Sequence, residues 1–207
     1  MAIIDILNSL QNEINQCETL IAHAHASDHL SRPILPALDQ KQITVAAFLN
    51  MFISWESFLE KAFGNYMTGG ATINGNYPVK YVAPPSMEAA FAMIIGTHRY
   101  FDYGNHENVK KLATMYFENG YPFEPNVSSI ISELADLRTM RNASAHITST
   151  TQSALEALAL RIFGQPRPGI DLYQLLVSRY PRAPLGNTVF TYYRDKLLIA
   201  ASLIAKG

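Results

Sequence analysis

Apolar side chains recur every three or four residues over long stretches of this 207-residue chain, and this spacing constrains the fold more than any other feature. The period matches the turn of an α-helix, whereas a half-buried strand would alternate apolar and polar residues. It predicts long helices over 3–26 and 44–66. Pro33 and Pro36 interrupt the pattern between them, because proline lacks a backbone donor and does not continue a helix.

Shorter segments farther along the chain show the same period. They predict helices over 86–100, 106–119, about 128–146, 151–163, 171–179 and 188–205. The stretch 67–85 is rich in Gly, Pro and Asn, so a long excursion is expected there. No stretch shows a convincing series of alternating strands. The sequence therefore predicts an all-α fold with a single domain over 1–207, a bundle of long helices with shorter additions.

Composition narrows the classes of function. Hydrophobic residues make up 48% of the chain and charged residues 16%, which is typical of a folded domain and suggests that a partner covers apolar surface. The formal net charge of −1 gives no overall attraction to nucleic acid, so RNA binding would need a local cluster of Arg and Lys. The sequence predicts a soluble cytoplasmic protein, because it has a single cysteine, lacks a basic signal region and contains no apolar run long enough to span a membrane.

Two charged side chains are predicted on apolar helix faces. The stripe of Leu134 and Leu137 continues at helical spacing to Arg141, which falls within about 40° of the same face. Upstream, Glu56 occupies the middle of another apolar stripe, beside Trp55. A lone buried charge is costly, so Arg141 and Glu56 are expected to pair or to line a polar pocket. An ion pair that serves only folding is the alternative.

The segment RNASAH brings together Arg141, Asn142 and His146. Asn142 and His146 are four positions apart and share a helix face. Arg141 and His146 would lie about 140° apart around a regular helix. They can therefore meet only if the helix ends or distorts there, or if two chains share the site.

The segment RNASAH resembles the R-x4-H motif of HEPN-domain ribonucleases, a family of small all-helical bundles. The upstream segment SWESFLEKAF resembles the aromatic–Glu segment on an early helix of several HEPN subgroups. The resemblance covers about residues 40–150 and points to the bacterial HEPN-like nucleases of defence and toxin–antitoxin systems. It implies a HEPN-like bundle, from which the long Gly/Pro-rich loop and the additional short helices are departures.

The resemblance implies metal-independent cleavage of RNA, in which a 2′-hydroxyl attacks the adjacent phosphate and leaves a 2′,3′-cyclic phosphate end. It assigns His146 as the acid or base and Arg141 as the donor that holds the phosphate. Asn142 would orient the phosphate or His146, and Glu56 would fix Arg141 or tune His146. Neither a metal nor a cofactor is expected in this mechanism.

HEPN sites usually form where two protomers face each other, so a two-fold homodimer around the 128–146 helix is expected. Positive charge near the shared cleft is expected to attract RNA, and it would come from Arg138, Lys110 and Lys111. The expected partners are thus RNA, a second copy of the chain and, in a toxin system, an antitoxin protein.

Two other interpretations remain open at this point. His25 and His29 are four residues apart, a spacing that can hold a metal, although solvated histidines at a helix end are the simpler explanation. From another class of function, the chain could be a non-catalytic helical module that binds a nucleotide or a partner protein through the same inward pocket. Ribonuclease activity separates this module from the enzyme.

Overall fold

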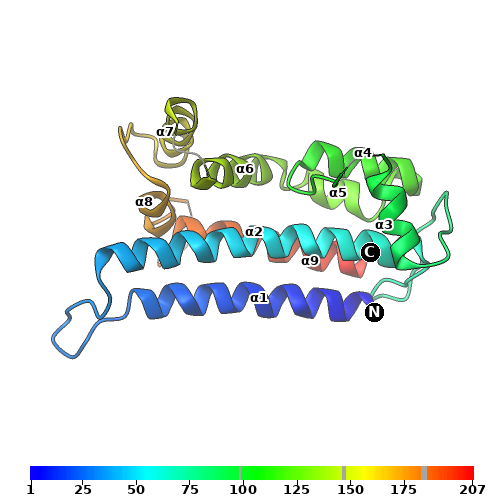
Figure 1. The fold of residues 1–207 in the computed structure, drawn as a ribbon, viewed down its shortest axis with the longest axis horizontal. Helices are drawn as coiled ribbons and strands as arrows, with labels where there is room; N and C mark the ends of the chain where they lie inside the picture. Colours follow the sequence, from blue (N-terminus) through cyan, green and yellow to red (C-terminus); the bar gives the residue numbers. More distant parts are fainter. Residues whose placement is uncertain (98, 146–147, 183–185) are drawn as a thin grey trace. The chain divides into compact units, whose positions relative to one another are not determined.

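The computed structural model describes residues 1–97, 99–145, 148–182 and 186–207, and the regular elements in these ranges are helices (Figure 1). No β-strand forms in these ranges beyond three isolated backbone bridges. The prediction of an all-α chain is confirmed. The helices are α1 (Ile3–Ala24), α2 (Ala37–Met67), α3 (Met87–Ile95), α4 (His106–Tyr116), the 3₁₀-helix η1 (Glu118–Gly120), α5 (Phe123–Ser128), α6 (Ile131–Ala145), α7 (Ser149–Phe163), α8 (Leu172–Val177) and α9 (Val189–Lys206).

Several helix boundaries differ from the prediction, and α3, for example, ends at Ile95 rather than near residue 100. α2 begins at Ala37 rather than near residue 44, since Pro36 precedes the helix and its carbonyl accepts a backbone bond from Gln40 N at 3.0 Å. The single helix predicted over 128–146 is instead two helices, because α5 ends at Ser128 and α6 begins at Ile131.

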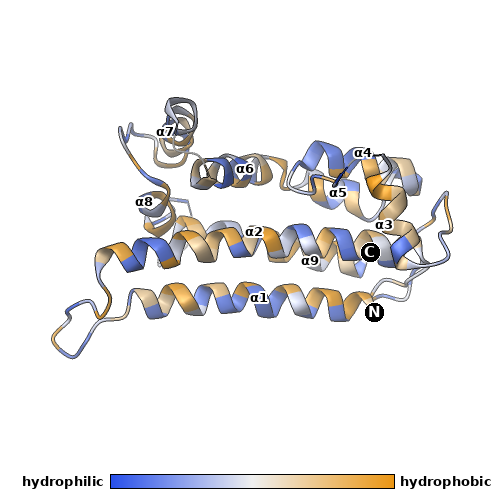
Figure 2. Ribbon diagram, viewed as in Figure 1, coloured by the Kyte–Doolittle hydropathy of each residue, from blue (hydrophilic) through white to orange (hydrophobic). Residues whose placement is uncertain are grey.

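The chain forms two compact units. The first unit comprises residues 1–11, 54–135 and 196–207, and the second comprises residues 12–53 and 136–195. The helices α1, α2, α6 and α9 each contribute residues to both units. The expectation of a single domain stays a prediction. Figure 2 shows polar and apolar residues mixed along α1 and α2, as expected for helices with one buried face.

Aromatic side chains fill the interior of the first unit. Phe63 stacks on Phe123 with 3.7 Å between ring centroids and an interplanar angle of 4°. Phe117 packs against both rings, and all three side chains are fully buried. Burial of each such side chain stabilises the fold by roughly 1.5–3 kcal/mol relative to exposure.

The Gly/Pro-rich segment over 68–86 contains no helix, and backbone bonds attach it to the first unit. Ile73 N donates to Ala205 O at 2.8 Å, next to the end of α9. Tyr81 N donates to Tyr116 O at 2.9 Å, and Val79 O accepts from Glu118 N at 2.9 Å. The segment is therefore held against α9 and against the junction of α4 with η1.

The second unit packs α7 and α8 with the adjoining parts of α1, α2, α6 and α9. Its buried apolar side chains include Phe48, Leu137, Met140, Leu158 and Leu175. Asp171 caps α8 by accepting a bond from Gln174 N at 2.8 Å, and Thr148 caps α7 by accepting one from Thr151 N at 3.2 Å. These caps satisfy backbone donors that the first turn of a helix leaves unpaired.

None of the helices in the described part of the chain is both long and apolar enough to cross a membrane.

Candidate functional site

Arg141 and Asn142 lie side by side, both exposed, in the last two turns of α6. Arg141 Nη1 donates to Asn142 Oδ1 at 3.4 Å, a long and therefore weak hydrogen bond. Ser144 Oγ donates to the Arg141 carbonyl oxygen at 2.6 Å, within the same turn. The end of α6 thus presents a guanidinium and an amide to solvent.

The prediction that Arg141 lies on a buried face is wrong. The buried side of α6 is centred between Leu137 and Met140, which are both fully buried, and it also includes Asp136. Leu134 is also buried, and Arg141 lies at nearly the same angle two turns later, yet it is exposed. No residue of α6 after Met140 is buried, so the buried face ends before Arg141. Helical spacing predicts which side of a helix a residue lies on, but it does not show where along the helix the covering residues end.

No carboxylate in the described ranges forms an ion pair with Arg141. By contrast, Arg161 pairs with Asp136, and Arg194 pairs with Glu18 and Asp195. An exposed guanidinium without a carboxylate partner keeps its planar set of donors for a phosphate, which it can bind through two parallel bonds.

His146 lies outside the described residues, so its expected approach to Arg141 stays a prediction. Glu56 is half-buried in α2 and belongs to the first unit, whereas Arg141 and Asn142 belong to the second. Contact of Glu56 with these residues or with His146 therefore also stays a prediction. Its neighbour Trp55 is fully buried and stacks on Phe58.

The three cations expected to assist RNA binding differ in their surroundings. Arg138 is half-buried and lies one turn before Arg141, so the two are neighbours on the surface of α6. Lys110 and Lys111 belong to the first unit. Lys110 Nζ lies 3.7 Å from Glu124 Oε1, whereas Lys111 is exposed. Their joint role with the arginines stays a prediction.

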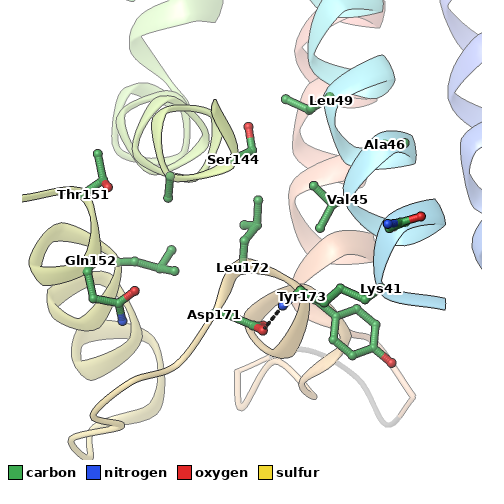
Figure 3. A pocket seen from close by; sticks show the side chains of 13 residues that line it. Lys41, Val45, Ala46, Leu49, Ser144, Thr151, Gln152, Asp171, Leu172 and Tyr173 are labelled. Atoms are coloured by element: carbon green, nitrogen blue, oxygen red, sulfur yellow. Dashed lines mark hydrogen bonds and ion pairs between the residues drawn. The ribbon is translucent and has the colours of Figure 1, made fainter. Parts of the chain in front are cut away.

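A cavity of about 370 Å³ opens beside the end of α6, within the second unit (Figure 3). Its lining comes from four helices and from the N-cap of α8. Figure 3 shows Val45 and Leu49 of α2 and Leu172 of α8 directed into the space that faces Ser144 of α6. Sequence reasoning missed this cavity, because it exists only where the four helices converge.

Polar groups stand at the edge of the cavity. Lys41 Nζ donates to Asp171 Oδ2 at 2.8 Å, and both side chains are partly exposed. Gln152 Nε2 donates to Glu156 Oε1 and to Ile170 O, at 3.0 Å each. The walls of the cavity are thus apolar, and its edge carries donors and acceptors.

Of the two histidines considered as metal ligands, His25 has structural partners and His29 is exposed. His25 Nε2 lies 3.1 Å from Thr44 Oγ1, and its ring stacks on Tyr173 at 5.8 Å. Asp28 accepts bonds from the backbone N–H groups of Leu30 and Arg32, which close a turn, and these bonds help to lower the pKa of its carboxyl. Within the ranges that the structure describes, no three His, Cys, Asp or Glu side chains gather in a way that could hold a metal ion.

A buried polar network on α6 escaped the sequence reasoning. The Asp136 side chain, in a residue only 7% exposed, accepts a bond from Tyr193 Oη at 2.7 Å and pairs with Arg161. Burial, and then the Asp136 charge, raise the pKa of Tyr193. The sequence gives little signal for this network, because Met140 is the one apolar residue three or four positions from Asp136. Asp136 therefore ties α6 to α7 and α9 a little more than one turn before Arg141.

Comparisons of the chain with protein-family models, with curated proteins and with solved structures find no match. The resemblance of RNASAH and SWESFLEKAF to HEPN segments therefore stands on those residues alone. What the described geometry adds is an exposed Arg–Asn pair, next to a cavity, on a helix end that a buried network holds in place.

Proposed function

We propose that this chain is a metal-independent endoribonuclease of the HEPN type, which binds an RNA phosphate at the end of α6. The observation that carries the proposal is the exposed Arg141–Asn142 pair, since the guanidinium makes no ion pair with any described carboxylate. The same two residues open the segment that resembles the R-x4-H motif.

Each residue has one role in the proposed reaction. Arg141 holds the phosphate and stabilises the charge that develops on its oxygens. Asn142 orients the phosphate, because its weak bond to Arg141 is easily exchanged for a phosphate oxygen. His146 transfers protons, since imidazole titrates near neutral pH.

The reaction proceeds within one RNA strand. The 2′-oxygen forms a bond to phosphorus and gives its proton to the base. The bond from phosphorus to the 5′-oxygen breaks, and that oxygen takes a proton from the acid. The products are a 2′,3′-cyclic phosphate and a 5′-hydroxyl end, in a mechanism that requires no metal.

A second copy of the chain completes the proposed site. Because Arg141 and Asn142 are exposed, a two-fold axis near the end of α6 would bring both copies of the motif into one cleft. In a toxin or defence system, an antitoxin protein would restrain this activity. Mixed dimers of Arg141→Ala and His146→Ala chains test whether residues of both protomers build one site. If they do, the activity of the mixed dimers differs from the sum of the activities of the two parent dimers.

The main experiment incubates the purified protein with total RNA in EDTA and maps the ends produced. We expect cleavage that leaves cyclic phosphates. Arg141→Ala should lower its rate by roughly 100-fold or more, the typical effect of removing a donor that stabilises transition-state charge. Arg179→Ala is the matched control, because Arg179 is also an exposed arginine of the second unit and lies outside the motif.

Three results would contradict the proposal. One is cleavage that stops in EDTA, and another is cleavage that His146→Ala leaves unchanged. The third is a complete lack of cleavage by the wild-type protein, which would favour the non-catalytic binding module.

A further inference from the structure

We infer that the cavity beside the end of α6 receives an unpaired nucleobase of the RNA whose phosphate Arg141 holds. This inference rests on the proposed function and specifies its substrate as RNA with at least one base unstacked at the cleavage site. Recognition of RNA sequence generally targets such bases, because they can be turned out of the strand into a protein pocket.

The size of the cavity suits this occupant. Its volume of about 370 Å³ lies at the lower end of the range for small-molecule sites, roughly 300–1,000 Å³. That range extends to drug-sized ligands, whereas a nucleobase is a small, flat molecule. A single base, with part of its ribose at the mouth, is therefore a better match than a larger cofactor.

The walls of the cavity suit the faces of a base. Val45, Leu49, Leu155 and Leu172 line the cavity, and they come from three different helices. Proteins hold an extruded base between apolar or aromatic side chains, which cover its two faces. Burial of these faces requires no particular sequence, so the walls provide affinity rather than selectivity.

The edge of the cavity suits the polar rim of a base. Lys41 uses one ammonium donor for Asp171, and its other two donors make no bond to a described residue. The Gln42 amide, also part of the lining, makes no bond to a described residue and offers both a donor and an acceptor. Gln152 has already committed its N–H donors to Glu156 and Ile170. Lys41 and Gln42 are therefore the residues that would select the base.

The position of the cavity links it to the phosphate site. Ser144 lines the cavity and follows Arg141 by three positions on α6, so their Cβ atoms lie about 5–6 Å apart. Ser144 Oγ also bonds to the Arg141 carbonyl. In a nucleotide, one sugar separates the phosphate from the base. One nucleotide can therefore reach from the Arg141 guanidinium into the cavity.

The experiment measures binding of nucleotides that cannot be cleaved. The four deoxynucleoside 3′-monophosphates lack the attacking 2′-hydroxyl, and an abasic deoxyribose 3-phosphate provides the comparison. Their titration into ¹⁵N-labelled protein by NMR detects even millimolar affinity. We expect at least one of the four to bind about tenfold tighter than the abasic phosphate, within the range for stacking of one base. The Gln42 side-chain amide should shift during that titration.

Two matched variants locate the binding. Ala46→Trp fills the cavity from an exposed position that lines it, without removing a buried side chain. It should abolish the preference for a base and leave the affinity for the abasic phosphate unchanged. Ala157→Trp, at an exposed position of α7 outside the lining, should preserve the preference. Arg141→Ala should weaken all five ligands by a similar factor.

The outcomes separate this inference from the proposed function. If no nucleotide exceeds the abasic phosphate, or if Ala46→Trp keeps the preference, the inference is overturned even when the protein cleaves RNA. If the base preference is found and is lost in Ala46→Trp but the protein cleaves no RNA, the cavity assignment stands and the nuclease proposal falls. Tight binding of hexanoate without any base preference would reassign the cavity to apolar ligands.

Discussion

In the first unit, stacked rings such as Phe63 and Phe123 fill the interior, and its buried polar side chains, Ser54, Asn65 and Thr72, are uncharged. In the second unit, the carboxylate of Asp136 is buried under Tyr193 and Arg161, and a cavity opens beside an exposed arginine. Apolar packing gives stability without directional chemistry, whereas a buried charge fixes the position of the helix that carries it. Under the proposed function, the phosphate is bound in the second unit, whereas the aromatic interior of the first unit serves stability.

The largest effect on stability is expected in the aromatic interior of the first unit. Phe123→Ala removes a fully buried ring that stacks on Phe63, so it should lower the free energy of unfolding by about 3–5 kcal/mol. Urea unfolding measures this loss. Tyr100→Ala is the control, because Tyr100 is an aromatic residue that is 75% exposed, and it should change stability by less than about 0.5 kcal/mol. Equal effects of the two substitutions would remove the structural contrast.

Loss of Asp136 tests the buried network of the second unit. Asp136→Ala strands the Tyr193 hydroxyl in a buried setting, which should cost about 1–3 kcal/mol. Asp136→Asn should cost less, since the amide oxygen still accepts the tyrosine bond. The same unfolding assay ranks the two variants. If Asp136→Asn cost as much as Asp136→Ala, charge pairing with the half-exposed Arg161, which both variants lose, would outweigh the hydrogen bond.

Alkaline pH should destabilise both units through buried tyrosines. Burial raises the pKa values of Tyr66 and Tyr193 in the folded protein, whereas in the unfolded chain both titrate near pH 10. Above that pH the folded state binds more protons, so stability present at neutral pH is lost as pH rises. Each tyrosine contributes a slope of up to about 1.4 kcal/mol per pH unit. Thermal unfolding from pH 8 to 11 should show a shallower decline for Tyr66→Phe, and an unchanged decline would contradict the assignment.

The smallest effect is expected at the end of α6. Arg141 is exposed and makes no ion pair with a described residue, so Arg141→Ala should change the free energy of unfolding by less than about 0.5 kcal/mol. Thermal melts of the variant used in the cleavage assay provide the measurement. A much larger loss would mean that Arg141 supports the fold, which would weaken the interpretation of its kinetics.

Periodicity in the sequence was enough to predict most of the helices, because each buries one apolar stripe. It failed at the break between α5 and α6, since the buried Ile130 lies in that break and continues the apolar spacing. It also misplaced Arg141, because the buried face of α6 ends at Met140, and spacing alone does not show where burial along a helix ends.

The candidate site could be predicted only where it is local in sequence. Arg141 and Asn142 are adjacent, so their proximity follows from the chain itself. The cavity depends on Val45, Leu155 and Leu172, which are more than a hundred residues apart at the extremes and meet only after folding. The expected contacts of Glu56 and His146 with Arg141 stay predictions.

The attachment of the 68–86 segment has a consequence for how this protein can diverge. Main-chain groups of Ile73, Val79 and Tyr81 make the bonds that hold it, and all three side chains project into solvent. Natural sequences related to this one can therefore exchange these side chains freely, and an epitope or purification tag could be grafted there with little penalty. Proline is the exception at positions 73 and 81, where the amide hydrogen itself is the anchor.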